Sequence, residues 1–225
     1  MISLIYSIFN RTTLFARGLE SIAKQNFNLS DIEIVIVDDQ SSEDIKKSYE
    51  PLIDKCRIKH IVYDHTKSPL YTGEDTWYHT QAISANIGLQ KAAGDVVCLS
   101  QPEMIHSPDS LKIGYELARQ NKSVFCELLL GSQKFSEWLD INKPNFSEML
   151  AKAQELGLEY QFAHQPPDFY EIYWYIMFFP RQIAIDINGI DLKYQNGVYA
   201  EDDQFKMRMR MAGCPEVYAG RPLLA

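Results

Sequence analysis

The sequence lacks paired cysteines, an excess of basic charge and an apolar run long enough to cross a membrane. Its four cysteines are widely scattered and form no CxxC pair, which predicts free, mostly buried thiols and fits a reducing compartment. The formal net charge of −8 excludes a broad basic footprint for nucleic acid and argues against a strongly basic membrane-binding surface. A small anionic ligand is still compatible, because it needs only local donors or a metal.

Neither a membrane span nor a leader sequence is expected. FYEIYWYIMFF, residues 169–179, is the most apolar stretch after the N-terminus, but it is too short to span a bilayer and contains Glu171. The chain opens directly with MISLIYSIF, without the basic segment and cleavage site of a signal peptide. We therefore expect a cytoplasmic location, while peripheral membrane association stays open.

The first half of the sequence alternates segments of strand and helix character. Strands are expected at residues 2–8, 32–37, 57–64 and 95–99, and helices at about 12–25, from 41 or 42 onward, at 77–93 and at 107–120. Thr12 or Thr13 can cap the first of these helices. This order predicts parallel strands joined by crossover helices, which is an α/β core of three layers.

The second half has no such regular alternation. Strands are expected at 122–130 and 172–179, and helices at 145–157, 180–189 and 201–213. No clear linker, internal repeat or low-complexity tail interrupts the chain. Its 225 residues, of which 46% are hydrophobic, therefore favour one domain, 1–225.

Polar side chains follow three of the predicted strands. They are the stretch from Ser7 to Arg11, the pair Asp38-Asp39, and the stretch from Gln101 to Glu103. In a parallel sheet these carboxyl ends face one crevice, where α/β proteins bind ligands. Structural explanations stay open for each group: a turn with a helix cap at Asp38-Asp39, a strand terminator at 101–103, and a solvated helix start at Glu201-Asp202-Asp203.

Four stretches of the sequence follow one another in an order that can be compared with known families. ISLIYSIFNRTTLFARGLESIAKQNF is followed by IEIVIVDDQSSED, SANIGLQKAAGDVVCL and NGIDLKYQNGVYAEDDQFKMRMRMAG. In this order the chain resembles family 2 glycosyltransferases. The resemblance implies the GT-A fold, a Rossmann-like α/β/α arrangement with a mostly parallel central sheet and a smaller acceptor-side portion. It also implies a nucleotide-binding half, 1–105, and an acceptor-side half, 106–225.

The activity implied by the resemblance is transfer of a sugar from a nucleotide-diphosphate sugar, of UDP or GDP type, to an acceptor hydroxyl with inversion. The acceptor would be a saccharide or a lipid-linked molecule, in polysaccharide or glycoconjugate biosynthesis. Two rival interpretations are kept. One is a non-catalytic homologue that only binds nucleotide sugars. The other is a nucleotidyltransferase, which the absence of glycine from YSIFNRTT disfavours.

The resemblance places Ser7, Ile8 and Phe9 beside the nucleobase, with Arg11 toward the diphosphate. Ser7 stands where the family usually has proline. Phe9 could stack on the base or belong to the core. Arg11 could equally be a solvated residue at the start of a helix.

Asp38 and Asp39 match the family's pair for base and ribose, since a carboxylate can accept hydrogen bonds from a uracil N–H or from ribose hydroxyls. Asn86 matches an asparagine that faces the donor. The residue before it is Ala85, where the family often has arginine. One phosphate or sugar contact is therefore missing or supplied elsewhere.

Gln101-Pro102-Glu103 aligns with the family's metal-binding Asp-x-Asp. The resemblance implies a divalent cation, Mn²⁺ or Mg²⁺, with Glu103 as the metal ligand and Gln101 as a neutral oxygen donor toward the nucleotide sugar. A site so poor in carboxylates should bind metal weakly. His106 is interpreted as a solvent-exposed capping residue rather than a ligand.

Glu201 and Asp202 match the family's acidic pair at a helix N-terminus. In inverting members the aspartate is the general base on the acceptor hydroxyl. We therefore expect Asp202 to be the base, with Glu201 as the second candidate.

Overall fold

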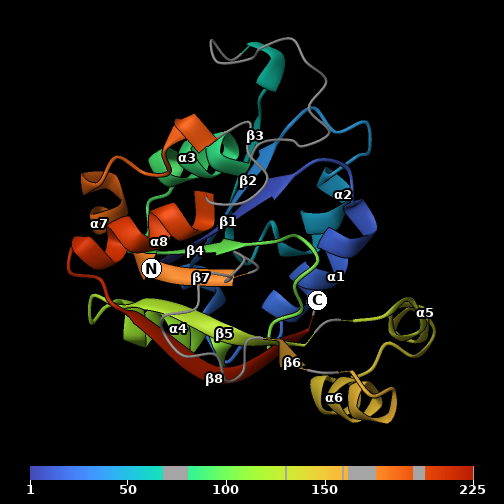
Figure 1. Ribbon diagram of the computed structural model, residues 1–225. Coiled ribbons are helices and arrows are strands. Elements are labelled where there is room, and N and C mark those ends of the chain that lie inside the picture. Colours follow the sequence, from blue (N-terminus) through green and yellow to red (C-terminus); the bar gives the residue numbers. More distant parts are fainter. Residues whose placement is uncertain (68–80, 130, 159, 162–175, 195–200, 225) are drawn as a thin grey trace.

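The computed structural model describes residues 1–67, 81–129, 131–158, 160–161, 176–194 and 201–224 (Figure 1). The strands are β1 (Ile2–Ile8), β2 (Ile32–Asp38), β3 (Arg57–Val62), β4 (Val96–Ser100), β5 (Ser123–Leu129), β6 (Tyr160–Gln161), β7 (Ile176–Pro180) and β8 (Glu216–Leu224). The α-helices are α1 (Thr12–Ile22), α2 (Lys46–Tyr49), α3 (Gln81–Lys91), α4 (Ser110–Ala118), α5 (Gln133–Asn142), α6 (Phe146–Glu155), α7 (Arg181–Asp186) and α8 (Glu201–Met211). Short 3-10 helices are η1 (Leu29–Asp31), η2 (Glu50–Leu52), η3 (His65–Lys67) and η4 (Leu192–Tyr194).

The described strands form one sheet in the order β3-β2-β1-β4-β7-β5-β6, with β8 paired to β5 outside this path. β1, β2, β3 and β4 are mutually parallel. β7 runs antiparallel to both β4 and β5. The predicted parallel strands with crossover helices are therefore confirmed for the first half of the chain.

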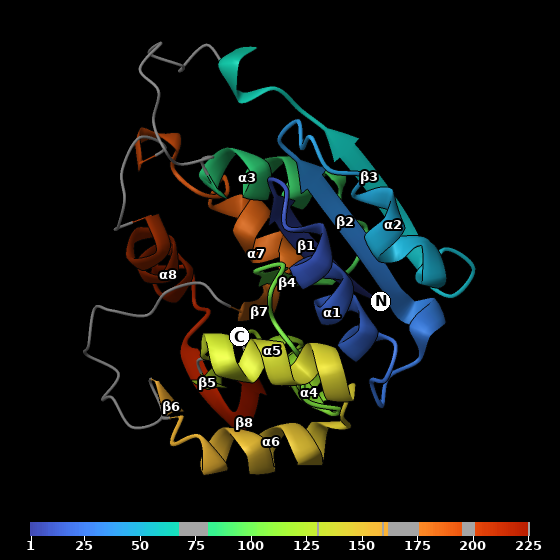
Figure 2. The ribbon, with the colours of Figure 1, turned by 90° about the vertical axis from the view of Figure 1, so that its right-hand side faces the viewer.

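Helices cover both faces of this sheet. On one face Leu4 and Tyr6 of β1 pack with α1, α2 and α4, and the core there includes Phe15 and Leu111. On the other face Ile5 packs with residues of α3, α7 and α8, and Figures 1 and 2 show these three helices on that side of the sheet. The alternation of side chains along each buried strand supplies apolar groups to both layers. This is the predicted three-layer α/β/α fold with a mostly parallel sheet.

Helices α5 and α6 stand apart from these two layers, beside the β5–β6 end of the sheet (Figure 1). They have a small core of their own around Phe135 and Leu139, which reaches the main body through Ile105 and Leu129. Helix α5 and strand β8 were not expected from the sequence. In β8 a glycine and a proline interrupt the apolar pattern, and its pairing with β5 shifts register between Phe125 and Glu127.

The start of α1 also differs from expectation. Neither Thr12 nor Thr13 is the cap, because Arg11 occupies the cap position in a left-handed conformation and makes no side-chain capping bond. The Thr12 N–H instead donates 2.7 Å to Oε2 of Glu43, a carboxylate on the loop after β2. The predicted start of the third helix at residue 77 lies outside the described residues.

All four cysteine thiols are buried and none forms a disulfide, as predicted. No helix within the described ranges is long and apolar enough to cross a membrane.

Candidate functional site

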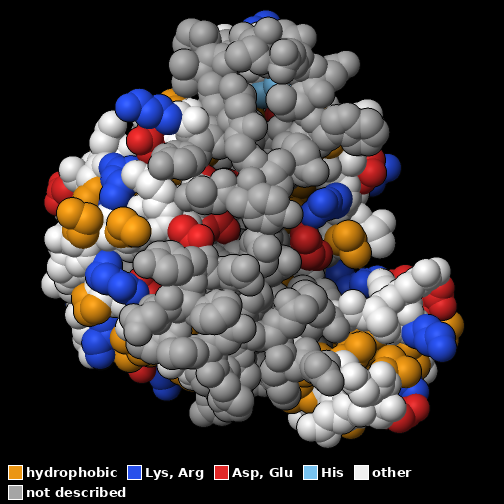
Figure 3. Space-filling view, viewed as in Figure 1, with side chains coloured by type: hydrophobic (Ala, Val, Ile, Leu, Met, Phe, Trp, Pro, Cys, Tyr) orange, Lys and Arg blue, Asp and Glu red, His pale blue; other side chains and the backbone are white. Residues whose placement is uncertain are grey.

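The carboxyl ends of β1, β2 and β4 meet at one edge of the sheet. Ile8 pairs with Asp38 and Tyr6 with Ser100, and the Asp39 N–H donates 3.0 Å to the Ile8 carbonyl. The three polar strand ends found in the sequence therefore lie along the same edge. Figure 3 shows acidic side chains near the middle of the viewed face, part of them against a basic side chain.

Arg11 and Glu103 bridge two of these strand ends. Nη1 of Arg11 lies 3.2 Å from Oε1 and 3.1 Å from Oε2 of Glu103. The Arg11 side chain is 53% exposed and that of Glu103 is 24% exposed. The family resemblance gave these two residues separate roles: Glu103 as the metal ligand, and Arg11 either toward the diphosphate or solvated at a helix start. The structure joins them as an ion pair.

Each aspartate of the Asp38-Asp39 pair is buried and bonded to a histidine. Oδ2 of Asp38 lies 3.1 Å from Nε2 of His60, and its Oδ1 accepts from the Ser41 N–H at 2.9 Å. Oδ1 of Asp39 lies 2.9 Å from Nδ1 of His65. These contacts hold both carboxylates in fixed orientations.

Sequence reasoning missed both histidines. A signal for His60 was present, because alternation along RIKHIVYD places it two residues before Val62, the strand partner of Asp38, and so on the same face. His65 follows β3 in the short helix η3, where no periodic pattern points to Asp39.

Helix α3 is attached to the site edge by polar contacts. Ser84 hydrogen-bonds Ser7 through the two hydroxyls, and the Gln101 amide donates 2.9 Å to Oε1 of Gln81. The predicted contacts of Ser7 and Gln101 with a nucleotide sugar stay predictions, but both side chains have defined partners here.

Asn86 holds the loop after α7. Its Nδ2 donates to the Ile190 carbonyl and its Oδ1 accepts from the Ile190 N–H, both at 2.8 Å. Gly189 has φ +62°, and a Cβ there would lie 2.3 Å from Oδ1 of Asn86. The expected contact of Asn86 with the donor stays a prediction; its described role is to fix this loop.

Glu201 and Asp202 form the first turn of α8. The helix packs against the sheet through an edge-to-face contact of Phe205 with Phe179 of β7, whose ring centroids lie 5.4 Å apart. Burial raises the pKa of the Glu201 carboxyl above its ordinary value, and its Oε2 has no hydrogen-bond partner among the described residues. A carboxylate in such surroundings is a stronger proton acceptor than a fully solvated one.

We predict that Glu201→Gln stabilises the protein at neutral pH. The folded-state pKa of Glu201 lies above the unfolded value, so its ionisation costs stability as pH rises from the unfolded pKa through the folded one. Glutamine removes this cost, for a gain of at most about 1 kcal/mol because the carboxyl is only half buried. Urea denaturation at pH 4 and pH 7.5 measures it: the gain should be present at pH 7.5 and small at pH 4. An equal gain at both pH values would contradict the prediction.

The described residues do not fit a protein-held divalent cation. No group of three or more His, Cys, Asp or Glu side chains capable of holding a metal occurs among them. Glu103, the predicted ligand, has both oxygens against the Arg11 guanidinium, and the Gln101 amide is bonded to Gln81. A hard cation is usually bound through several oxygen ligands, whereas here one carboxylate already has a cation beside it.

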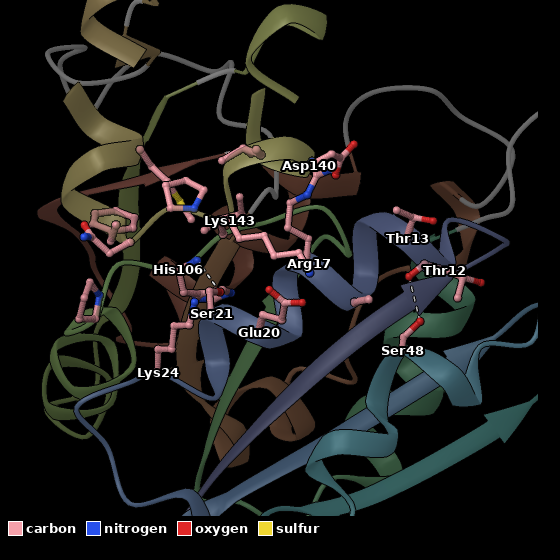
Figure 4. Close-up of a pocket in the computed structure, with 18 of the residues that line it drawn as sticks. Thr12, Thr13, Arg17, Glu20, Ser21, Lys24, Ser48, His106, Asp140 and Lys143 are labelled. Carbon is pink, nitrogen blue, oxygen red and sulfur yellow. Dashed lines mark hydrogen bonds and ion pairs between the residues drawn. The ribbon is translucent and has the colours of Figure 1, made fainter. Parts of the chain in front are cut away.

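The structure also has a cleft of about 690 Å³ between α1 and the α5–α6 segment (Figure 4). In the figure α1 lines one side, with Arg17 and Ser21, and Asp140 and Lys143 lie on the other. None of the predicted site residues lines it. This cleft is therefore distinct from the edge that carries the polar strand ends.

The interpretation of His106, which lines this cleft, was wrong. The side chain is only 2% exposed, and burial lowers its pKa to about 3, so the imidazole is neutral. Its backbone N–H donates 2.9 Å to the Ser21 hydroxyl. The chain after Glu103 thus folds against α1 and takes His106 into the interior.

Comparison with known proteins agrees with the fold. A family model described as Glycosyl transferase family 2 matches residues 3–165. Among solved structures, Staphylococcus aureus TarS 1-349 is 15% identical with a TM-score of 0.67, and the match covers all of this chain and 60% of that one. The mannosyltransferase PcManGT from Pyrobaculum calidifontis, in complex with GDP-Man and Mn²⁺, is 16% identical with a TM-score of 0.65, covering 100% and 56%. TarS 1-349 has also been solved with UDP-GlcNAc. This chain spans about 60% of the length of TarS 1-349.

Proposed function

The chain belongs to glycosyl transferase family 2, and we propose that it transfers a sugar from a nucleotide-diphosphate sugar to an acceptor hydroxyl. The observation that carries this proposal is the meeting of Arg11, Asp38-Asp39 and Glu103 at one sheet edge. That edge is where α/β proteins place nucleotides. The similar structures bind UDP-GlcNAc and GDP-Man, which supports a UDP- or GDP-type donor.

The nucleoside is proposed to lie against the ends of β1 and β2. Phe9 is 38% exposed and offers a ring on which a base can stack. Ile8, the residue before it, is buried in the core at the end of β1. Asp39 and Asp38, oriented by their histidines, accept hydrogen bonds from the base and the ribose.

The transfer step is proposed to be a single displacement with inversion. Asp202 accepts the proton of the acceptor hydroxyl as the acceptor oxygen bonds to the anomeric carbon. The bond from that carbon to the diphosphate oxygen breaks, and its electron pair leaves with the nucleoside diphosphate. Glu201 is the neighbouring carboxyl, and its burial favours proton acceptance.

The predicted Mn²⁺ or Mg²⁺ takes part in no step of this transfer, because the described residues do not bring together the ligands of a metal site.

The acceptor is proposed to be a saccharide or a lipid-linked molecule.

A thermal-shift screen of UDP, GDP and their sugars, each with EDTA or with Mn²⁺, tests the proposal. At a hundredfold excess over Kd, binding should stabilise the fold by about 2.7 kcal/mol, which raises Tm by roughly 5–10 °C for a chain of this length. Binding of a nucleotide sugar without transfer or hydrolysis would favour the non-catalytic homologue. Preference for a nucleoside triphosphate would favour the nucleotidyltransferase, and no shift with any nucleotide would refute nucleotide binding.

A further inference from the structure

The ion pair of Arg11 with Glu103 stands where the family's acidic motif holds a metal. We propose that Arg11, oriented by Glu103, supplies the positive charge that holds the donor diphosphate, and that nucleoside-diphosphate binding therefore needs no divalent cation. This inference rests on the proposed function and assigns the diphosphate contact within that site. Arg11 is the binding residue, and Glu103 is a positioning residue.

The guanidinium has spare donors in a suitable arrangement. Glu103 is contacted through Nη1 alone, and Nε and Nη2 make no hydrogen bond to any described residue. Since arginine carries five N–H donors in a planar fork, the Nε–Nη2 edge can bind two phosphate oxygens while Nη1 keeps Glu103. Arg11 would thus link a carboxylate to the diphosphate, as a metal ion does.

The backbone of Asn10 and Arg11 is strained, and the loop at residues 41–43 stabilises this conformation. Asn10 and Arg11 have φ values of 56° and 67°, a left-handed conformation that non-glycine residues seldom adopt. Two successive residues in this region cost stability and persist only where the surroundings enforce them.

Hydrogen bonds to residues 41–43 enforce this conformation. The Asn10 N–H donates 2.7 Å to the Ser41 hydroxyl, and Oδ1 of Asn10 accepts from the Ser42 N–H at 2.9 Å and the Glu43 N–H at 3.3 Å. The Thr12 N–H donates to Glu43 on the other side of Arg11. The strained pair is thus fixed from both sides, and the side chain it presents to the site edge is Arg11.

The electrostatics also favour recruitment of an anion by this pair. An ion pair that is partly accessible to water contributes little net stability, so Glu103 orients Arg11 without making its charge unavailable. A diphosphate carries more negative charge than one carboxylate and accepts through more oxygens. Guanidinium contacts with phosphate are charge-assisted and among the stronger hydrogen bonds.

Calorimetric titration of the protein with UDP and with GDP, in EDTA and in MnCl₂, tests this inference. In EDTA the wild type should bind one of the two diphosphates, and Arg11→Gln should weaken that affinity by about tenfold to a hundredfold, the loss of a charged hydrogen-bonded pair. Affinity for the corresponding nucleoside should stay within about threefold, because the base and ribose contacts lie elsewhere. Arg11→Lys should recover only part of the loss, since lysine lacks the planar fork.

Two further variants separate this role from metal ligation and from general charge effects. Glu103→Gln should weaken diphosphate binding in EDTA by only a few-fold, and MnCl₂ should change neither its affinity nor that of the wild type. Arg119→Gln removes an arginine that is 63% exposed and paired with Asp95 away from this edge, so it should bind like the wild type. Thermal melts establish that each variant is folded.

The opposite results are equally clear. Diphosphate binding that requires Mn²⁺, is lost in Glu103→Gln and is unchanged in Arg11→Gln would overturn this inference and leave the proposed function intact. Binding of Mn²⁺ to the protein alone at Glu103, detected as loss of the free-ion electron paramagnetic resonance signal that Glu103→Gln restores, would also overturn it. Failure of every nucleotide and nucleoside to bind would overturn the proposed function as well.

Discussion

Asp202→Asn is expected to lower the rate of sugar transfer by about 10²- to 10⁴-fold, the usual contribution of a positioned general base. Asparagine keeps the shape of the side chain but cannot accept the acceptor's proton. Because the proposed role begins with proton removal, donor affinity should change by less than about threefold. Steady-state transfer assays with parallel calorimetric titration of the nucleoside diphosphate measure both effects.

Asp203→Asn is the matched control for this variant. It makes the same change one residue along the same helical turn, at a carboxylate that pairs with Lys206 at 3.1 Å. Transfer by this variant should stay within a few-fold of the wild type, while stability falls slightly. Normal turnover in Asp202→Asn together with a large loss in Glu201→Gln would assign the base to Glu201 instead.

The parallel half of the fold could be predicted because its signals are local. Near-continuous apolar runs such as 32–37 indicate strands buried on both faces. A helix between two such strands indicates a crossover connection, which makes the two strands parallel. The convergence of three strand ends followed from that topology. Helix α5 and strand β8 could not be found in this way, because α5 packs against α6 through a small separate core and β8 is defined by its pairing with β5.

The candidate site was predictable as a set of positions but not as a set of contacts. Asp38 and Asp39 stood out in the sequence, whereas their partners His60 and His65 come from β3 and the residues after it. The pairing of Arg11 with Glu103 joins residues 92 positions apart, and it depends on a strained backbone that no helix or strand pattern encodes. Tertiary contacts of this kind decide which polar side chains are available to a ligand.

Gly18→Ala is expected to destabilise the protein by about 1–2 kcal/mol, although alanine favours a helix interior by about 1 kcal/mol over glycine. A Cβ at residue 18 would lie 2.7 Å from the Pro102 carbonyl oxygen and 2.9 Å from that of Met104. Both atoms belong to the backbone of the turn that carries Glu103. The His106 N–H, just after this turn, donates to the Ser21 hydroxyl of α1, which itself donates to the Gly18 carbonyl within the helix. The turn is therefore held against α1 and cannot yield as a side chain would. Because two backbone oxygens lie within 3.0 Å of the added Cβ, we expect a cost in the upper half of the range of about 1–3 kcal/mol for overpacking. Subtracting the gain in helix propensity leaves the net loss of about 1–2 kcal/mol.

The added methyl group should also affect the site, because pushing the turn at residues 102–104 away from α1 moves Glu103 away from Arg11. We therefore expect Gly18→Ala to lower both the free energy of unfolding, measured in urea, and the affinity for UDP or GDP in EDTA. Glu20→Ala, at an exposed position of the same helix, should change stability by no more than about 0.5 kcal/mol and leave nucleotide affinity unchanged. If Gly18→Ala is instead more stable than the wild type, helix propensity outweighs the contact, and α1 does not restrain the turn that bears Glu103. Loss of affinity at unchanged stability would mean that the turn shifts at little cost, and the position of Glu103 would then depend on Gly18 more than the fold does.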